Sequence, residues 1–154
     1  MNKTGNTRTV YNFLNTCNKC YNDIEYPLLG DISYGELIFQ TTDGQDFFLV
    51  GLIDNKTFDF ICSFLKSKEG LKIGKADPHK ILALLADKVK GKDLATDYPI
   101  CPICKSRQKH FNDNKRTTQR QISFATWTYF ESLSVDNKLI HFEDIIGLHG
   151  SRLL

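Results

Sequence analysis

The chain has 154 residues, of which 41% are hydrophobic and 25% are charged, close to the values of an average globular domain. A chain of this length can bury enough surface to form a hydrophobic core, which excludes whole-chain disorder, collagen and coiled-coil structures. The net charge is +2 and the sequence pI is about 8.2, below the strongly basic values typical of nucleic-acid-binding domains.

The hydropathy pattern predicts neither a transmembrane helix nor a secretory signal. The longest strictly apolar run, Ile81–Ala86, is far shorter than the roughly 20 residues that a membrane-spanning helix needs. The polar residues 1–6 are not followed by the apolar core of a signal peptide. We therefore expect a cytoplasmic protein with no membrane partner, in which cysteines stay reduced.

The first third of the chain predicts strands and loops. Apolar residues within 10–14 indicate a brief strand, whereas 21–35 is interrupted by proline and glycine and looks like a loop. The strand-forming runs 36–40 and 46–52 flank an Asp-Gly dipeptide, which suits the positive-φ positions of a hairpin turn. We therefore predict an antiparallel hairpin over 36–52.

Two amphipathic helices are predicted after this hairpin, because apolar residues recur every three or four positions. The two stripes comprise Phe58, Ile61, Cys62 and Leu65, and then Ile81, Leu82, Leu85 and Val89. Asp54 or Thr57 is expected to cap the first helix, and Asp77 followed by proline the second. Gly91 is expected to end the second helix. Hairpin and helices together form a predicted insertion over 36–91.

The last third predicts a second hairpin. Residues 122–130 read as a strand with large side chains on both faces, and a turn at Asp136-Asn137 leads to another apolar run at 139–142. The sequence therefore predicts a C-terminal β-hairpin over 122–142. All these elements together favour an α+β fold and a single domain over 1–154.

Two Cys-x-x-Cys pairs are the most specific motif, and they suggest one tetrahedral zinc ion held by four thiolates. The proposed ligands are Cys17, Cys20, Cys101 and Cys104. Two intervening residues let both sulfurs of a pair point at one ion from a tight turn. The 80 residues between the pairs exceed the usual 15–20, so the insertion must return the chain to its start.

These two turns resemble the knuckles of the zinc-ribbon class of sites. The resemblance covers Cys17-Asn-Lys-Cys20 and Cys101-Pro-Ile-Cys104 and identifies a type of site rather than a protein family. It implies a structural zinc that joins the N- and C-terminal parts, because four protein ligands leave no open position for water.

Three other interpretations of the cysteines stay open. Cys101-Pro-Ile-Cys104 is similar to the redox motif of glutaredoxin-like proteins, although the residues after it show no apolar stripe for the required helix. A zinc deaminase would need His-x-Glu before the cysteines, whereas His141-Phe-Glu143 follows them. Separate disulfides or free thiols are the third alternative. Cys62 is expected to be a core residue.

Other enzyme signatures fail, so we expect a protein that is not an enzyme. Gly70–Ala76 has three residues between its glycines where a phosphate loop needs four, and Ala76 has no hydroxyl for magnesium. Ser151 lacks the strand–turn–helix setting of a nucleophile elbow. The four histidines form no close pair on a predicted helix.

The charges are unevenly distributed, and this suggests two functions. Residues 21–60 contain eight acidic residues and one lysine, a balance of −7. Their acidic and aromatic side chains suit an inhibitor or adaptor, such as an immunity or antitoxin protein that neutralises a basic toxin or nuclease. The expected contact residues are Asp23, Glu25, Tyr26, Asp31, Tyr34, Glu36, Asp43 and Asp46.

The alternative function is nucleic-acid binding by the segment 105–120, which contains six basic residues and one aspartate, a balance of +5. An aromatic ring just beyond it would stack on bases. The expected residues are Lys105, Arg107, Lys109, Lys115, Arg116, Arg120 and Trp127. The acidic excess is larger and its aromatics are more numerous, so the sequence favours the inhibitor.

Overall fold

The computed structural model describes residues 7–29, 34–95, 99–108 and 115–150. The chain forms two compact units, a sheet unit (residues 1–53 and 94–125) and a helical unit (residues 54–93 and 126–154). The described residues contain one six-stranded sheet and five helices, so the predicted α+β class is confirmed. The single domain over 1–154 stays a prediction.

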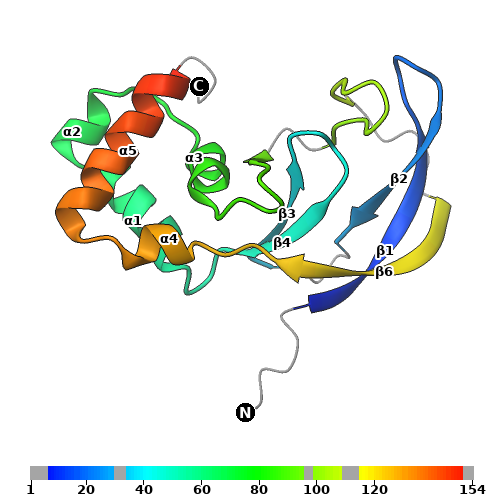
Figure 1. The fold of residues 1–154 in the computed structure, drawn as a ribbon, viewed down its shortest axis with the longest axis horizontal. Helices are drawn as coiled ribbons and strands as arrows, with labels where there is room; N and C mark the ends of the chain where they lie inside the picture. The colour runs from blue at the N-terminus through cyan, green and yellow to red at the C-terminus, as the bar shows by residue number, and fades with distance from the viewer. Residues whose placement is uncertain (1–6, 30–33, 96–98, 109–114, 151–154) are drawn as a thin grey trace, which may run out of the picture. The chain divides into compact units, whose positions relative to one another are not determined.

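The sheet unit is built on six strands in the order β2-β1-β6-β4-β3-β5 (Figure 1). They are β1 (Thr7–Thr16), β2 (Asp23–Leu28), β3 (Glu36–Thr41), β4 (Phe47–Gly51), β5 (Leu94–Ala95) and β6 (Lys115–Phe124). All neighbours are antiparallel except β4 and β6, which pair in parallel at Phe48–Ser123 and Leu49–Phe124. The first and last strands of this unit are therefore hydrogen-bonded to each other.

The predicted hairpin over 36–52 is confirmed as β3 and β4. Gly44 in its turn has φ +77°, a conformation that glycine adopts without strain. A Cβ atom there would lie 3.1 Å from the backbone oxygen of Ile100. Glycine thus lets the segment before Cys101 approach the hairpin closely. The expected loop over 21–35 is wrong in part, because β2 pairs with β1 along residues 23–28.

The helical unit contains α1 (Lys56–Leu65), α2 (Lys68–Leu71), α3 (Pro78–Leu85), α4 (Thr128–Ser132) and α5 (Val135–His149). The two predicted helices are present as α1 and α3. Asp77 caps α3 as expected, whereas α1 is capped by Asn55, not by Asp54 or Thr57. Helix α3 ends at Leu85, before Val89 and Gly91.

The predicted C-terminal hairpin over 122–142 is wrong. Strand β6 ends at Phe124, and α4 and α5 follow. Ser134 caps α5 through the backbone N–H of Asn137, and the buried Phe142 and Ile145 lie three residues apart, a helical spacing. Aromatic and β-branched residues favoured a strand locally, but packing decided the structure. No helix among the described residues is long and apolar enough to span a membrane.

Candidate metal centre

Each Cys-x-x-Cys pair lies in a tight turn of the same construction. In the first turn, which joins β1 to β2, Cys17 N–H donates to Asn22 O at 2.9 Å and Tyr21 N–H donates to Cys17 O at 3.1 Å. In the second turn, Cys101 and Lys105 N–H groups make the equivalent bonds, both at 2.9 Å. Tyr21 and Lys105, each following the second cysteine, have φ values of 59° and 60°.

The two turns bring all four sulfurs together, within 4.8 Å of one another. The Cys17–Cys104 and Cys20–Cys101 sulfurs are separated by 3.6 and 3.8 Å. A tetrahedral ion bound at about 2.3 Å from each thiolate would separate its ligand sulfurs by about 3.8 Å. A disulfide would need about 2.05 Å, and all five cysteines are free thiols. The four cysteines are therefore positioned to hold a metal ion.

The surroundings of the sulfurs contain further donors that the sequence did not indicate. The Gln108 side chain donates from Nε2 to Cys17 Sγ at 3.3 Å and to Ser106 O at 3.1 Å, while its Oε1 accepts from Asn18 N–H at 2.9 Å. Because this buried amide bonds to both turns, it holds them together. The Ser106 hydroxyl lies 3.0 Å from Cys104 Sγ. Such contacts orient metal ligands and stabilise thiolates.

The surroundings of the thiols shift their pKa values in different directions. Burial of Cys17 opposes ionisation, but the N–H groups of Cys20 and Lys19 and the Ser106 hydroxyl outweigh it and lower the Cys17 pKa to about 5. Burial raises the pKa of the Cys101 thiol to about 11. A positive ion among the sulfurs would favour the thiolate form of every one of them.

The cluster belongs to the hydrophobic core of the sheet unit. Cys17 and Cys101 are fully buried, together with Tyr26 and apolar residues such as Leu49 and Ile122. Burial first, and then the nearby cysteine charges, raise the pKa of Tyr26 far above its usual range, so this phenol stays neutral. A metal ion bound by these cysteines would therefore lie within this core, and its binding would be coupled to the packing of the core.

The rival interpretations of the cysteines gain no support here. Residues 105–108, which follow the glutaredoxin-like motif, form no helix. Among the described residues, the cluster within reach of one metal ion consists of the four cysteines and contains no histidine.

The structure divides the predicted acidic contact set. Asp23 and Glu25 are exposed on β2, at one end of the sheet order, and Tyr34 is 91% exposed just before β3. Three others lie on or just after β3: Glu36 pairs with Arg8, Asp43 accepts from Thr41 Oγ1 at 2.7 Å, and Asp46 follows the turn. Tyr26 is fully buried and packs edge-on against Phe47, so its predicted surface contact is wrong. Asp31 lies outside the described residues.

The described members of the predicted basic set lie in two places, on β6 and around the second cysteine turn. Lys115, Arg116 and Arg120 lie on β6, and Lys105 and Arg107 are exposed in and beside the second cysteine turn. Lys105 Nζ donates to the backbone oxygens of Asp43 and Pro102, which ties this turn to the hairpin. Lys109 lies outside the described residues.

The expectation that Trp127 is an exposed ring that stacks on bases is wrong. Trp127 is 7% exposed, and its Nε1 donates to Leu82 O at 2.9 Å inside the helical unit. Its ring is therefore a packing element that has no open face for a base.

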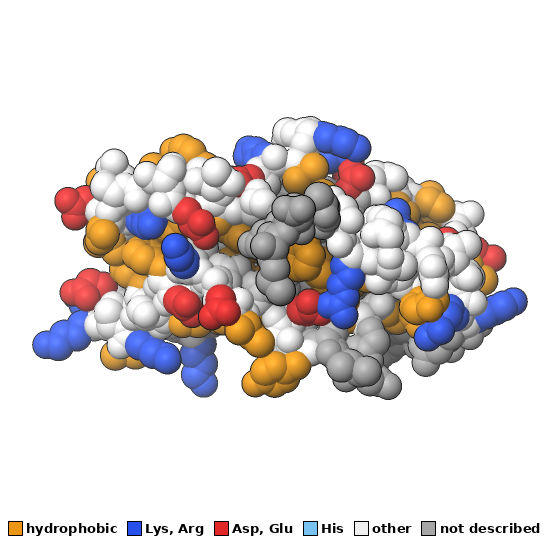
Figure 2. All heavy atoms as spheres, turned by 90° about the horizontal axis from the view of Figure 1, so that it is seen from below, with side chains coloured by type: hydrophobic (Ala, Val, Ile, Leu, Met, Phe, Trp, Pro, Cys, Tyr) orange, Lys and Arg blue, Asp and Glu red, His pale blue; other side chains and the backbone are white. Residues whose placement is uncertain are grey.

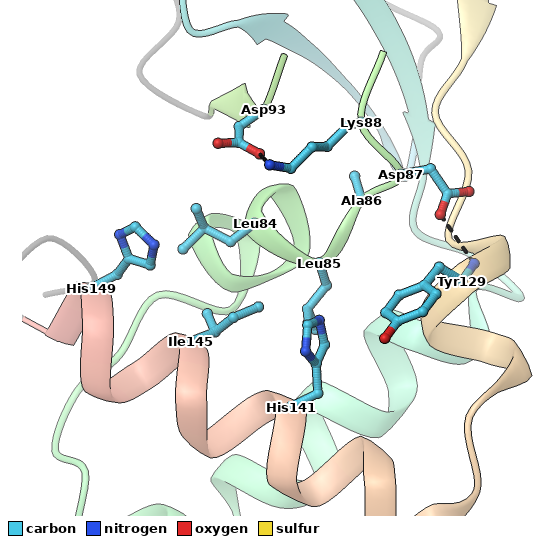
Figure 3. Close-up of a pocket in the computed structure, with 10 residues that line it drawn as sticks. All are labelled: Leu84, Leu85, Ala86, Asp87, Lys88, Asp93, Tyr129, His141, Ile145 and His149. Carbon is cyan, nitrogen blue, oxygen red and sulfur yellow. Dashed lines mark hydrogen bonds and ion pairs between the residues drawn. The ribbon is translucent and has the colours of Figure 1, made fainter. Parts of the chain in front are cut away.

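The helical unit contains a separate hollow of about 490 Å³, between α3 and α5 (Figure 3). His141, Ile145 and His149 project into it from successive turns of α5. At its rim, Lys88 forms an ion pair with Asp93 at 3.4 Å. These charged side chains are thus paired within the fold, and we assign no ligand to this hollow.

Asp87, at the edge of this hollow, fixes the start of α4. Its carboxylate accepts from Thr126 Oγ1 at 2.6 Å and from the N–H groups of Thr128 and Tyr129 at 2.8 and 3.1 Å. Burial opposes ionisation, but these donors lower the pKa of Asp87 below its ordinary value. The ionised carboxylate acts as an N-cap supplied from elsewhere in the chain.

We expect Asp87→Ala to destabilise the helical unit by about 1–2 kcal/mol at pH 7, the usual cost of losing a cap. A lowered pKa means that this contribution is complete above the unfolded-state pKa of about 3.9 and is lost as pH falls through the folded-state pKa. Urea unfolding of both proteins at pH 7 and pH 3 measures the difference. An unchanged difference at pH 3 would contradict the electrostatic part of the argument.

Fold and site together define an α+β protein with a cluster of four cysteines positioned to hold a metal ion. No family model, curated protein or solved structure matches the chain.

Proposed function

We propose that this protein is a non-enzymatic, zinc-stabilised module that binds nucleic acid on its sheet unit. Zinc is the ion that best suits four thiolates in tetrahedral spacing, and four protein ligands leave no position for a reactive water. The sulfur separations of 3.6 and 3.8 Å support this choice of ion. The role of the metal would be to hold the sheet unit together.

The β6 strip, residues 115–121, is the observation that carries the proposal. A strand in a half-buried sheet usually alternates between buried and exposed side chains. Here residues 115–119 and 121 are all exposed, and Arg120 is half-buried. Strand β4 pairs with β6 at Ser123 and Phe124, so within the described part of the sheet β1 is the one strand that neighbours the strip.

The strip has the side chains that phosphate recognition requires. Three cations provide charge for the backbone of a nucleic acid, and Thr118 and Gln119 carry hydrogen-bond donors, whereas Thr117 and Gln121 already donate to Asn12 O and Thr9 Oγ1 on β1. The Arg116 guanidinium lies 3.9 Å from the centre of the Tyr11 ring on β1, which pre-orients it. Figure 2 shows lysine and arginine side chains at several places on the surface of the sheet unit.

We expect the double substitution Lys115→Glu/Arg116→Glu to weaken binding of a labelled single-stranded 12-mer by about tenfold or more at physiological salt. It should also flatten the dependence of affinity on salt, because fewer counterions are released on binding. Lys72→Glu/Lys75→Glu, exposed residues of the helical unit, changes net charge equally and serves as the control. Fluorescence anisotropy measures both effects. Equal losses in the two variants would contradict a localised site.

An inhibitor or adaptor that binds a basic protein is the second candidate. It is favoured by the exposed Asp23 and Glu25 on β2, a strand at the end of the sheet order, and by the exposed Tyr34. Affinity purification from native cells with and without nuclease distinguishes the two candidates. One stoichiometric basic protein that survives nuclease would favour the inhibitor, and nucleic acid in the untreated sample would favour the strip.

A further inference from the structure

Tyr21 occupies a strained backbone position. It directly follows Cys20 with φ 59°, where a non-glycine residue costs about 1–2 kcal/mol. The turn imposes this conformation, because the Tyr21 N–H donates to Cys17 O and the Cys17 N–H donates to Asn22 O. Glycine would adopt the same geometry without strain.

The Tyr21 side chain does not offset this strain by stabilising the fold. This side chain is 79% exposed, and the described residues offer it no side-chain hydrogen bond. Lys105, the equivalent residue of the second turn, differs in this respect, because its Nζ bonds two backbone oxygens. Strained residues whose side chains do not stabilise the fold are typical of functional surfaces.

The surroundings of Tyr21 indicate what that function is. Lys19 is exposed in the same turn, and Gln108 holds the exposed Arg107 next to this turn through its bonds to Asn18 and Cys17. Strand β1 leads into the turn only a few residues after Leu14, which pairs with Lys115 at the start of the β6 strip. Tyr21 is thus an exposed aromatic ring in the first cysteine turn, with the cations Lys19 and Arg107 in or beside this turn and the exposed Asp23 two residues further along the chain.

We propose that Tyr21 is the stacking platform for a base of single-stranded nucleic acid whose phosphates lie along the β6 strip. This inference rests on the proposed function and names its substrate as single-stranded. Duplexes keep their bases stacked on each other, whereas an unpaired base can lie flat on a tyrosine ring. Tyr11 on β1 is covered by Arg116 and Trp127 is buried, whereas the exposed Tyr34 precedes β3 and lies outside the pairing of β1 with β6. The metal centre would then position the ring as well as stabilise the sheet unit.

The test is Tyr21→Gly, which removes the ring and the strain together. We expect its melting temperature to equal or exceed that of the wild type, while affinity for labelled T12 and U12 falls about 5- to 150-fold, the range for loss of one stacked base. Tyr21→Phe should keep wild-type affinity within about twofold, because stacking needs no hydroxyl. Tyr34→Ala, at another highly exposed tyrosine, should change neither quantity.

The outcomes separate this inference from the proposed function. A wild-type protein that binds neither oligonucleotide overturns both. Wild-type binding that is unchanged in Tyr21→Gly, or that is equally tight for a 12-base-pair duplex, overturns the inference and leaves the β6 strip in place. A large fall in the melting temperature of Tyr21→Gly would show that the ring is structural, and this result also overturns it.

Discussion

Cys101→Ser is expected to remove the metal ion and to destabilise the sheet unit by several kcal/mol, enough to unfold it at physiological temperature. Cys101 is fully buried in the same core as Tyr26 and Leu49, so loss of one ligand disturbs both coordination and packing. Metal binding contributes directly to folding, since the unfolded chain has no preformed site. Apparent zinc-binding energies of about 10–16 kcal/mol in small zinc peptides show how large this coupling becomes.

Two further cysteine variants separate ligation from burial. Cys20→Ser changes a half-buried ligand and should also lose the metal, whereas Cys62→Ser changes a half-buried residue of α1 and should keep it. Elemental analysis of purified protein should give one zinc per chain in the wild type and in Cys62→Ser. Urea unfolding, with and without a strong chelator, measures stability. A wild-type unfolding curve that the chelator does not move would refute the coupling.

The local signals in the sequence predicted the elements whose structure depends on neighbouring residues. The Asp-Gly turn produced the β3–β4 hairpin, and Asp77-Pro78 marked the start of α3. Strand β2 was missed because a proline and nearby glycines suggested a loop, yet β2 is a strand at the end of the sheet order, where proline is tolerated. Turn and cap signals depend on residues close together in the chain, so they can be recognised in a single sequence.

The C-terminal segment shows where local signals fail. Residues such as Trp127 and Phe130 are common in strands, and nothing near them in sequence indicates the helical unit in which they are buried. Helix α4 begins without a side-chain cap of its own, because Asp87 supplies the cap from about 40 residues earlier. Contacts of this range can be read only from the folded chain.

The candidate metal centre also has a part that the sequence predicted and a part that it did not. The four cysteines were predicted from spacing alone, because a tight turn requires two intervening residues. The amides that organise the site, Gln108 and Gln40, were not predicted. Gln108 sits in a polar basic segment and Gln40 in a strand, where glutamine usually faces solvent. Their roles depend on partners 60–91 residues away.

Gln40 is the residue, among those that the sequence did not predict, whose substitution has the largest expected effect on stability. It is fully buried on β3, and its Nε2 donates to Ile100 O at 2.8 Å and to Gly44 O at 3.0 Å, while its Oε1 accepts from Ile100 N–H at 2.8 Å. The side chain therefore pairs with Ile100 as a neighbouring strand would. This attaches the residue before Cys101 to the hairpin.

We expect Gln40→Leu to destabilise the sheet unit by about 3 kcal/mol or more, because it leaves one N–H and two carbonyl groups buried without partners at about 1–3 kcal/mol each. Zinc affinity should fall as well, since the second turn loses its attachment beside a ligand. Gln40→Glu should be nearly as harmful, because its carboxylate can accept from Ile100 but cannot donate to the two carbonyls.

Gln119→Leu is the control, because Gln119 is exposed on β6 and its replacement should change stability by no more than about 0.5 kcal/mol. Urea unfolding measures stability, and competition with a chromogenic chelator measures zinc affinity. If Gln40→Leu unfolded like the control yet lost zinc, Gln40 would act on the metal ligands alone. If it kept zinc but lost stability, the second turn would hold its place through metal coordination, and the hairpin attachment would matter only for packing.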